Sequence, residues 1–249
     1  MARVYAFANQ KGGVGKTTTA INLAACLAEA GEKALVVDLD PQANATSGLG
    51  MRANGTSSYD LLDGAPLAEL AKETSFPNLF LVPSQPELAG AAVELSQREG
   101  GDRYLAQALE HAEGFDFVLL DCPPSLGPLT VNALAAADRV IVPVQAEYYA
   151  LEGLAQLVQS INLIKVRLNP KLEIAGVLLT MTDGRTRLST EVEAEVRKHF
   201  GALVFDAVVP RSVRVAEAPS HGLPVTHYDR RSRGAEAYWK VAMELVERR

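Results

Sequence analysis

The segment between residues 10 and 18, Gln-Lys-Gly-Gly-Val-Gly-Lys-Thr-Thr, restricts the possible folds of this chain more than any other. Its glycines, Gly12, Gly13 and Gly15, allow backbone N–H groups to turn inward around phosphate oxygens, where a Cβ atom would block the approach. Lys16 can supply positive charge to the β- and γ-phosphates, and the Thr17 hydroxyl can ligate Mg²⁺ at the start of a helix. The segment predicts a nucleotide-binding loop between a strand and a helix.

Two features set this loop apart from the ordinary pattern G-x-x-x-x-G-K-[ST]. Gln10 stands where that pattern has glycine, and Lys11 is a second lysine ahead of the usual one. A glycine-rich turn with two solvated lysines would be the simpler explanation, but the flanking sequence argues against it. Residues 4–8 form a short apolar run suited to a buried strand, and residues 17–30 form an alanine-rich helix that Gly31 is expected to end.

Two further apolar runs end in carboxylates. Residues 34–42 carry Asp38 and Asp40, which point to the same side if the strand continues that far. Residues 117–121 form another predicted strand, and Asp121 at its end would hold Mg²⁺ through a coordinated water. One strand that ends in aspartate is weak evidence. A phosphate loop followed by two such strands indicates a nucleotide site at the carboxyl edge of a parallel sheet.

These motifs support a resemblance to a known family. The form K-G-G-x-G-K-[ST] resembles the deviant Walker A loop of the ParA/MinD superfamily of ATPases. Five longer stretches resemble the small chromosomal ParA proteins called Soj, and they are residues 38–50, 121–127, 143–153, 210–222 and 228–238. The chain departs from this group at Ala43, where many relatives have glycine, and this puts the flexibility of that loop in question.

The resemblance implies an ATPase that uses ATP and Mg²⁺ and forms an ATP-sandwich homodimer. Lys11 would reach the γ-phosphate bound by the partner subunit, and Asp40 would orient the attacking water with support from Asp38. Thr17 and Asp121 would hold the metal ion. The implied nucleotide contacts are Lys11, Gly12, Gly13, Val14, Gly15, Lys16, Thr17, Thr18, Pro210 and Arg211.

The same resemblance implies nonspecific binding of double-stranded DNA by a surface that includes Arg185 and Arg214. A ParB-type centromere-binding partner would stimulate hydrolysis and release the dimer from DNA, with residues 40–50 and 121–128 as switch loops. The net charge of −6 does not exclude DNA, because a local basic surface is sufficient. Arginines are unevenly placed and gather toward the C-terminal end, among them Arg185, Arg187, Arg211, Arg214, Arg230, Arg231 and Arg233.

Helical and strand patterns alternate along the rest of the chain. This predicts an α/β fold of the P-loop NTPase type, a doubly wound and mostly parallel sheet with helices on both faces. We expect one domain over residues 1–249, with an irregular helical insertion near 51–97. The expected helices cover 101–113, 128–137, 149–168, 187–200 and 234–249, and the expected strands cover 139–144, 172–180 and 203–209.

No apolar run approaches the ~18 residues of a membrane span, so we expect a cytoplasmic protein without a membrane partner. The resemblance to Soj implies that it is also nucleoid-associated. Cys26 and Cys122 lack metal-ligand spacing, which argues against the related nitrogenase iron protein and favours two buried thiols. The four histidines, His111 among them, form no catalytic pattern.

Two alternative functions remain open. MinD proteins bind membrane through a terminal amphipathic helix, and an apolar stripe recurs at helical spacing near the end of this chain. We expect the stripe to pack on the sheet, because glutamates dilute the basic face that anionic lipid would attract. The stripe consists of Tyr238, Val241, Ala242 and Leu245. The second alternative is a metabolic ligase of the dethiobiotin or cobyrinate amide synthetase type, which would phosphorylate a small carboxylate and turn over without DNA.

Overall fold

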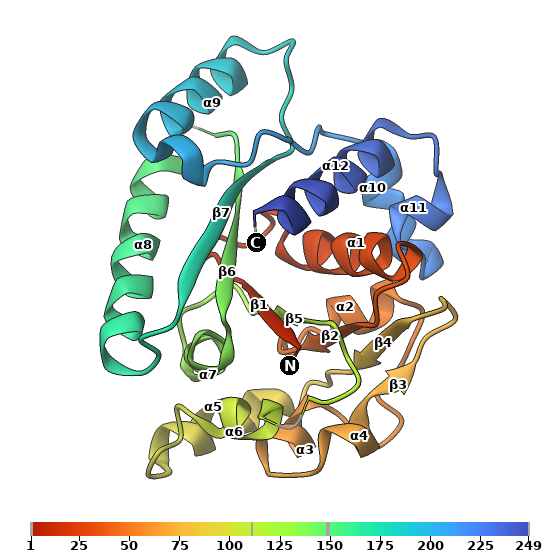
Figure 1. The fold of residues 1–249 in the computed structure, drawn as a ribbon, viewed down its shortest axis with the longest axis vertical. Helices are drawn as coiled ribbons and strands as arrows, with labels where there is room; N and C mark the ends of the chain where they lie inside the picture. The colour runs from red at the N-terminus through yellow and green to blue at the C-terminus, as the bar shows by residue number, and fades with distance from the viewer. Residues whose placement is uncertain (1, 111, 148–149, 249) are drawn as a thin grey trace.

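The computed structural model describes residues 2–110, 112–147 and 150–248, and within them one sheet of seven strands (Figure 1). The strand order is β3-β4-β2-β5-β1-β6-β7, and every neighbouring pair is parallel except β3 with β4. The predicted α/β fold with a mostly parallel sheet is confirmed. The strands are β1 (Arg3–Phe7), β2 (Ala34–Asp38), β3 (Lys72–Glu73), β4 (Leu79–Val82), β5 (Phe117–Asp121), β6 (Arg139–Gln145) and β7 (Glu173–Thr180).

Side chains of the central strands alternate between two apolar cores, which is why helices cover both faces of the sheet. In β1, Val4 and Ala6 belong to one core, and Tyr5 and Phe7 belong to the other. Helices α1 and α12 lie side by side over the second core (Figure 1). The helices are α1 (Lys16–Glu29), α2 (Asn44–Gly48), α3 (Ser58–Leu62), α4 (Leu67–Leu70), α5 (Leu88–Gln97), α6 (Tyr104–Leu109), α7 (Pro128–Ala136), α8 (Ala150–Arg167), α9 (Arg187–Phe200), α10 (Val213–Glu217), α11 (Val225–Tyr228) and α12 (Arg233–Glu247).

Helix α6 is shorter than the predicted helix over 101–113, because one side chain intercepts its first turn. Asn132 accepts the N–H of Leu105 (3.2 Å) and donates to the carbonyl of Gly101 (2.7 Å). In a continuous helix these two backbone groups would bond to each other. The predicted helix start at 149 and the residue His111 lie outside the described residues.

Segment 51–97 contributes a strand that the sequence analysis did not predict. Strand β4 pairs in parallel with β2, and the two-residue β3 pairs with the outer side of β4. Four apolar residues between Asn78 and Pro83 are too few to stand out from the turn-rich sequence around them. Because β4 lies next to β2, its carboxyl end brings Ser84 to the same edge of the sheet as Asp38.

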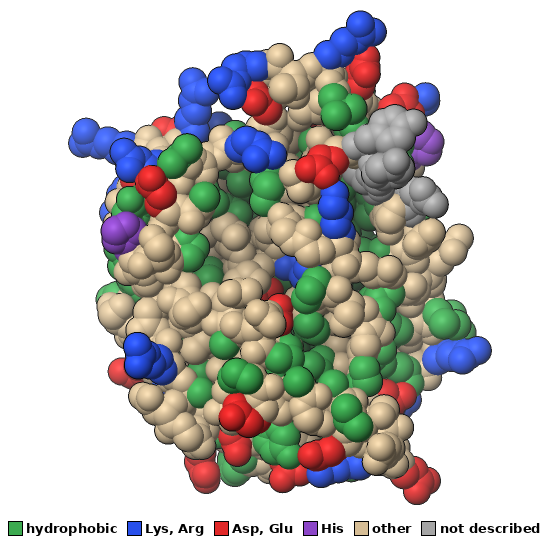
Figure 2. All heavy atoms as spheres, turned by 180° about the vertical axis from the view of Figure 1, so that it is seen from behind, with side chains coloured by type: hydrophobic (Ala, Val, Ile, Leu, Met, Phe, Trp, Pro, Cys, Tyr) green, Lys and Arg blue, Asp and Glu red, His purple; other side chains and the backbone are tan. Residues whose placement is uncertain are grey.

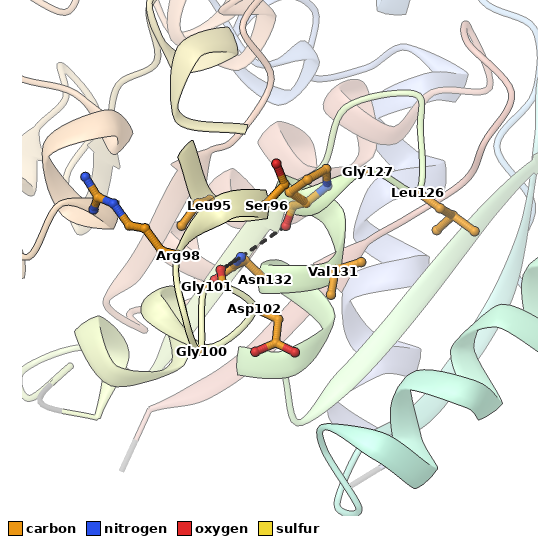
Figure 3. Close-up of a pocket in the computed structure, with 11 residues that line it drawn as sticks. Leu95, Ser96, Arg98, Gly100, Gly101, Asp102, Leu126, Gly127, Val131 and Asn132 are labelled. Atoms are coloured by element: carbon orange, nitrogen blue, oxygen red, sulfur yellow. Dashed lines mark hydrogen bonds between the residues drawn. The ribbon is translucent and has the colours of Figure 1, made fainter. Parts of the chain in front are cut away.

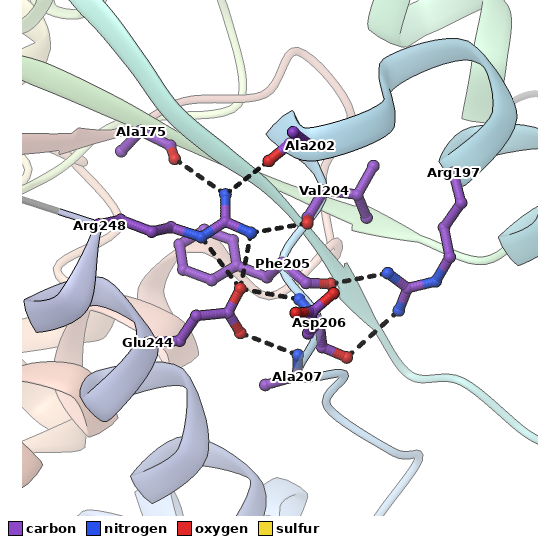
Figure 4. A network of polar contacts seen from close by, with 9 residues as sticks. All are labelled: Ala175, Arg197, Ala202, Val204, Phe205, Asp206, Ala207, Glu244 and Arg248. Atoms are coloured by element: carbon purple, nitrogen blue, oxygen red, sulfur yellow. Dashed lines mark hydrogen bonds and ion pairs between the residues drawn. The ribbon is translucent and has the colours of Figure 1, made fainter.

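The predicted strand over 203–209 is wrong. Residues 201–209 form a strap along β7, with an isolated bridge at Val204 and another just beyond the strap at Pro210. The Glu244 carboxylate accepts the N–H groups of Asp206 (2.8 Å) and Ala207 (2.9 Å), as Figure 4 shows. Side chains of the flanking helices therefore form hydrogen bonds with backbone groups of residues 201–209, which in a regular strand would pair with a neighbouring strand.

Two arginines complete the attachment of the strap (Figure 4). Arg197 of α9 donates to the carbonyls of Phe205 (3.0 Å) and Asp206 (3.3 Å). Arg248 forms an ion pair with Glu244 (2.6 Å), donates to the Val204 carbonyl (2.7 Å) and lies 4.4 Å from the centre of the Phe205 ring. The strap is thus fastened from both of its sides.

The apolar stripe of α12 is buried inside the fold. Tyr238, Val241, Ala242 and Leu245 are each at most 4% exposed and belong to the core shared with α1 and one sheet face. Within the described residues, none of the helices combines the length and apolarity needed to cross a membrane. Cys26 and Cys122 are free, buried thiols, as predicted.

Candidate functional site

The phosphate loop joins β1 to α1 at the carboxyl edge of the sheet. Gly15 precedes the helix with a left-handed backbone (φ +88°), which favours glycine, and among the described residues no side chain caps the first turn of α1. The hydroxyl of Thr180, at the end of β7, donates to the Val14 carbonyl (2.9 Å) and fixes the loop from the other side. The N–H groups of this helix end are therefore free to face an anion.

Lys16 is the buried cation of the site. Its side chain reaches back to the carbonyl oxygen of Lys11 (3.3 Å), and the residue is only 6% exposed. Burial lowers the pKa of its ammonium, while the nearby carboxylates Asp121 and Asp40 act in the opposite direction. A phosphate group would provide the negative charge that this buried ammonium needs.

Lys11 has a different environment from Lys16. Its N–H donates to the Asn9 side chain (3.0 Å), and its ammonium pairs with the Glu147 carboxylate at the surface. The Lys11 side chain is 50% exposed. It is not among the residues that line the nucleotide pocket of its own chain.

The pocket beside the phosphate loop has a volume of about 390 Å³. It brings together six predicted nucleotide contacts and the predicted catalytic aspartate, namely Gly12, Gly13, Gly15, Lys16, Thr17, Thr18 and Asp40. The remaining wall includes four residues of the predicted switch loops, Gln42, Asn44, Ser47 and Pro124. It also includes five residues that were not predicted, namely Ile21, Asn22, Met181, Pro219 and Leu223. These five residues come from three segments far apart in the chain, so spacing within one motif could not reveal them.

Asp121 lies fully buried at the end of β5, opposite Asp38 of β2 and Phe7 of β1 in the sheet register. Within the described residues, neither of its carboxylate oxygens has a hydrogen-bond partner of ordinary geometry. Burial raises its pKa well above the usual range, the charge of Asp38 adds to this, and the nearby Thr17 hydroxyl opposes it. A buried carboxylate without a partner beside a threonine hydroxyl fits a site for a hard divalent cation.

Asp38 and Asp40 play distinct structural parts. Strand β2 ends at Asp38 instead of continuing through Asp40, because the Asp40 N–H turns back to Asp38 Oδ1 (3.1 Å). Asp38 is completely buried, which raises its pKa to about 6 even though it accepts several hydrogen bonds. Asp40 accepts the Gln42 N–H (3.0 Å) and lines the pocket.

Ala43, at the loop position discussed above, has a left-handed backbone (φ +53°). Its N–H donates to the Asp40 carbonyl (2.8 Å). A left-handed alanine costs roughly 1 kcal/mol relative to glycine. Ala43 therefore places local backbone strain beside Asp40.

The two arginines expected to bind DNA are exposed and already paired with acidic residues. Arg185 makes a bidentate contact with Asp183 (2.9 and 2.8 Å), and these hydrogen bonds lower the pKa of Asp183 to about 2. Arg214 contacts Glu217 (3.2 Å) and Asp229 (3.3 Å). On the face shown in Figure 2, Lys and Arg side chains gather toward the upper edge, with some acidic ones among them.

Pro210 and Arg211 lie at the edge of the site but are not among the residues that line its pocket. The Arg211 N–H donates to the Thr182 carbonyl (3.0 Å), and Pro210 forms a bridge with Thr182. Met181, the residue before Thr182, does line the pocket and has a left-handed backbone (φ +51°). The predicted nucleotide contact of Pro210 and Arg211 stays a prediction.

A second cavity of about 430 Å³ lies between the α5–α6 connection and the start of α7 (Figure 3). Asn132 spans it, since its amide donates both to the Gly101 carbonyl and to the Pro128 carbonyl (3.1 Å). The Arg98 guanidinium points away from the cavity in Figure 3 and pairs with Asp63 (2.9 Å). Asn132 thereby anchors the helix that follows Asp121 and its loop.

Comparison with known proteins agrees with this geometry. A family model described as an AAA domain matches residues 2–174. Chromosome-partitioning ATPase Soj of Thermus thermophilus is 55% identical over 246 residues, with 99% of this chain and 96% of the relative covered. Sporulation initiation inhibitor protein Soj of Bacillus subtilis is 51% identical over 250 residues, with 99% of each covered.

Among solved structures, cobyrinic acid a,c-diamide synthase of Mycobacterium smegmatis with bound ADP and magnesium superposes with a TM-score of 0.86. It is 37% identical to this chain, with 99% of this chain and 95% of that protein covered. The identity to the two Soj proteins is higher, at 55% and 51%, over alignments that cover 99% of this chain. This chain therefore belongs to the ParA/Soj family of chromosome-partitioning ATPases.

Proposed function

We infer that this protein hydrolyses ATP to drive DNA partitioning through a cycle of dimerisation, nonspecific DNA binding and release. Family membership supports the ATPase reaction and the partitioning role. The observation that supports the dimerisation step of this cycle is the difference in burial between two lysines. Lys16 is buried in the pocket of its own chain, whereas Lys11 is exposed at the rim of that pocket.

The residues of the pocket have separable tasks in hydrolysis. The loop N–H groups and Lys16 hold the phosphates, while Asp40 orients the attacking water. Thr17 and Asp121 would hold Mg²⁺, and the unpartnered oxygens of Asp121 support this assignment. The metal ion supplies positive charge that offsets the charge developing on the phosphate oxygens.

Lys11 is proposed to act in the partner subunit. Its exposed ammonium can exchange Glu147 for a γ-phosphate presented by a second ATP-bound copy, which links nucleotide state to dimerisation. The dimer would then place the surfaces of Arg185 and Arg214 from both copies on one DNA duplex, in the cytoplasm and on the nucleoid. Phosphate contacts of this kind do not depend on base sequence.

A ParB-type partner is proposed to end the cycle. By stimulating hydrolysis it removes the γ-phosphate that Lys11 bridges, and the dimer separates and leaves the DNA. Residues 40–50 and 121–128, which contain Asp40 and Asp121, are proposed to move when the phosphate is lost.

The test of this function uses the variant Lys11→Ala. The matched control is Lys33→Ala, because Lys33 is also an exposed lysine but precedes the first residue of β2, at the end of that strand away from Asp38 and the phosphate loop. ATP affinity and sedimentation at saturating ATP are measured on the same samples. We expect Lys11→Ala to bind ATP through Lys16 and the loop glycines but to remain monomeric and fail to bind DNA, while Lys33→Ala behaves like the parent. A Lys11→Ala protein that dimerises and binds DNA normally would contradict the proposal.

The two alternatives carry separate signatures. A MinD-like membrane function needs the apolar face of α12, and that face is buried against the core here. A ligase function has support in the 37% identity to the Mycobacterium smegmatis synthase. ATP-dependent DNA binding by the parent would favour partitioning, whereas vesicle cosedimentation or turnover with a small carboxylate would favour an alternative.

A further inference from the structure

We propose that Thr46 and Ser84 are positioning residues that hold Asp38 and Asp40 in place for ATP hydrolysis. Thr46 lies on α2, and Ser84 follows β4, the strand that the sequence analysis missed. This inference rests on the proposed role of Asp40 in orienting water.

The two hydroxyls and the two aspartates form a closed ring of hydrogen bonds. The Ser84 N–H donates to Thr46 Oγ1 (2.9 Å), and the Thr46 hydroxyl donates to Asp38 Oδ2 (2.7 Å). The Asp40 N–H donates to the other oxygen, Asp38 Oδ1 (3.1 Å). The Ser84 hydroxyl closes the ring by donating to the Asp40 carbonyl (2.7 Å).

The ring has one internally consistent arrangement of hydrogens. An ionised Asp38 carboxylate accepts hydrogen bonds and cannot donate them, so the Thr46 hydroxyl must donate its hydrogen to Asp38. The oxygen lone pairs of Thr46 then accept the Ser84 N–H. All four residues are at most 6% exposed, so water does not compete for these bonds. The ring therefore fixes the relative position of two strands' carboxyl ends, β2 and β4.

The ring holds the backbone of Asp40, and its carboxylate takes no part in the ring. Its N–H is held by Asp38, and its carbonyl accepts from both Ser84 Oγ and the Ala43 N–H (2.8 Å). With the backbone held at both ends, the direction of the side chain into the pocket is set. A misplacement of about 1 Å at a reacting group can cost roughly 100-fold in rate, so small shifts of this backbone matter.

A purely structural role for the hydroxyls predicts a different pattern of effects. If they only stabilised the fold, their loss would lower the unfolding temperature and leave the hydrolysis rate of the remaining folded protein unchanged. If they position Asp40, the chemical step slows while ATP binding, which depends on the phosphate loop, stays close to normal.

The experiment compares Ser84→Ala and Thr46→Val with the conservative variant Thr46→Ser. Ser58→Ala is the matched control, because the Ser58 hydroxyl is equally buried but has no hydrogen-bond partner among the described residues. ATP affinity, single-turnover hydrolysis of bound ATP and thermal unfolding are measured for each protein. All measurements use the full chain with Mg²⁺.

We expect Ser84→Ala and Thr46→Val each to slow hydrolysis about tenfold with ATP affinity within about twofold of the parent. Thr46→Ser and Ser58→Ala should hydrolyse at the parent rate. Ser84→Ala removes one bond of the ring and Thr46→Val removes two, and either change opens it. The double variant should therefore lose little more hydrolysis rate than Thr46→Val alone.

Parent-like hydrolysis by folded Ser84→Ala would overturn the proposal, as would an equal loss of ATP affinity and rate. Should Thr46→Val fail to fold, Ser84→Ala still decides the question, since it removes a single oxygen atom. A parent protein without ATPase activity would instead refute the proposed function itself. The two failures are therefore distinguishable.

Discussion

The ammonium of Lys11 and the carboxylate of Glu147 form an ion pair within one chain at the rim of the phosphate loop. Both side chains are about half exposed, so the pair is of the weak kind that solvent screens. In the proposed dimer, Lys11 must leave Glu147 to reach the phosphate of the other subunit. Breaking the Lys11–Glu147 pair is therefore a small free-energy cost of forming the proposed dimer.

Glu147→Gln should make the ATP-bound dimer tighter. Exposed pairs contribute about 0.2–1 kcal/mol each, and a symmetric dimer would break two of them. We therefore expect the dimer dissociation constant to fall by about two- to thirtyfold, with ATP affinity unchanged. Sedimentation velocity across a concentration series at low and high salt measures this. Weaker dimerisation in Glu147→Gln would show that Glu147 contributes to the interface instead of competing with it.

Lys16→Ala and Asp40→Ala should separate binding from chemistry. Loss of the buried ammonium of Lys16 should weaken ATP binding by roughly 100-fold. Asp40→Ala should retain ATP and slow hydrolysis by about 10²–10⁴-fold, so that an ATP-bound dimer accumulates. Nucleotide affinity and size-exclusion chromatography with ATP test both expectations, and a strictly monomeric Asp40→Ala protein would count against the assigned role.

Arg185→Ala and Arg214→Ala should weaken DNA binding equally on unrelated sequences and reduce its salt dependence, since each removes a phosphate contact. ATPase activity without DNA should stay near the parent level. Arg98→Ala removes an ion-paired arginine beside α5 and serves as the control. Filter binding or fluorescence anisotropy at several salt concentrations gives the slopes, and unchanged affinity in both variants would mean that the DNA surface lies elsewhere.

Burial of Asp38 should leave a signature in the pH dependence of stability. Its folded-state pKa, about 6, lies above the usual value of 3.8, so the native state binds more protons than the unfolded state between these pH values. The contribution of Asp38 is thus most favourable below pH 4 and is lost as the pH rises through 6. Relative to Asp38→Asn, the parent should lose roughly 2–3 kcal/mol of unfolding free energy over this range.

Urea unfolding of both proteins from pH 4 to pH 7, without nucleotide and with a chelator, measures this difference. The comparison uses the change with pH, so the hydrogen bonds altered by the asparagine cancel to first order. A difference that stays constant, or that grows in favour of the parent as the pH rises, would contradict the assignment.

The sequence predicted the local elements of the site well, because each is encoded within a few consecutive residues. The glycine loop, α1 and the strand that ends at Asp121 all follow from short-range patterns. Ser84 could not be found in this way, since its role depends on β4 lying next to β2 in space. Long-range pairing of this kind leaves no periodicity in the sequence.

The errors have equally specific causes. Residues 203–209 have the apolar, β-branched composition of a strand, yet Glu244 and Arg197 take their backbone groups. In the same way, Asn132 removes the first turn from the predicted helix at 101. In both cases a side chain distant in sequence outcompetes the regular backbone pairing, and local propensity carries no information about it.

The strap along β7 also determines how the sheet ends. A bare outer strand offers unpaired N–H and C=O groups to any other chain, which is a common route to aggregation. Here the N–H groups of Phe205 and Val209 in the strap donate to carbonyl groups of β7, while the opposite margin of the sheet is the two charged residues of β3. Loss of the last turn of α12, with Glu244 and Arg248, would unfasten the strap and leave a long apolar strand open to self-association. The last turn of α12 is thus expected to limit self-association along β7, at a site remote from the phosphate loop.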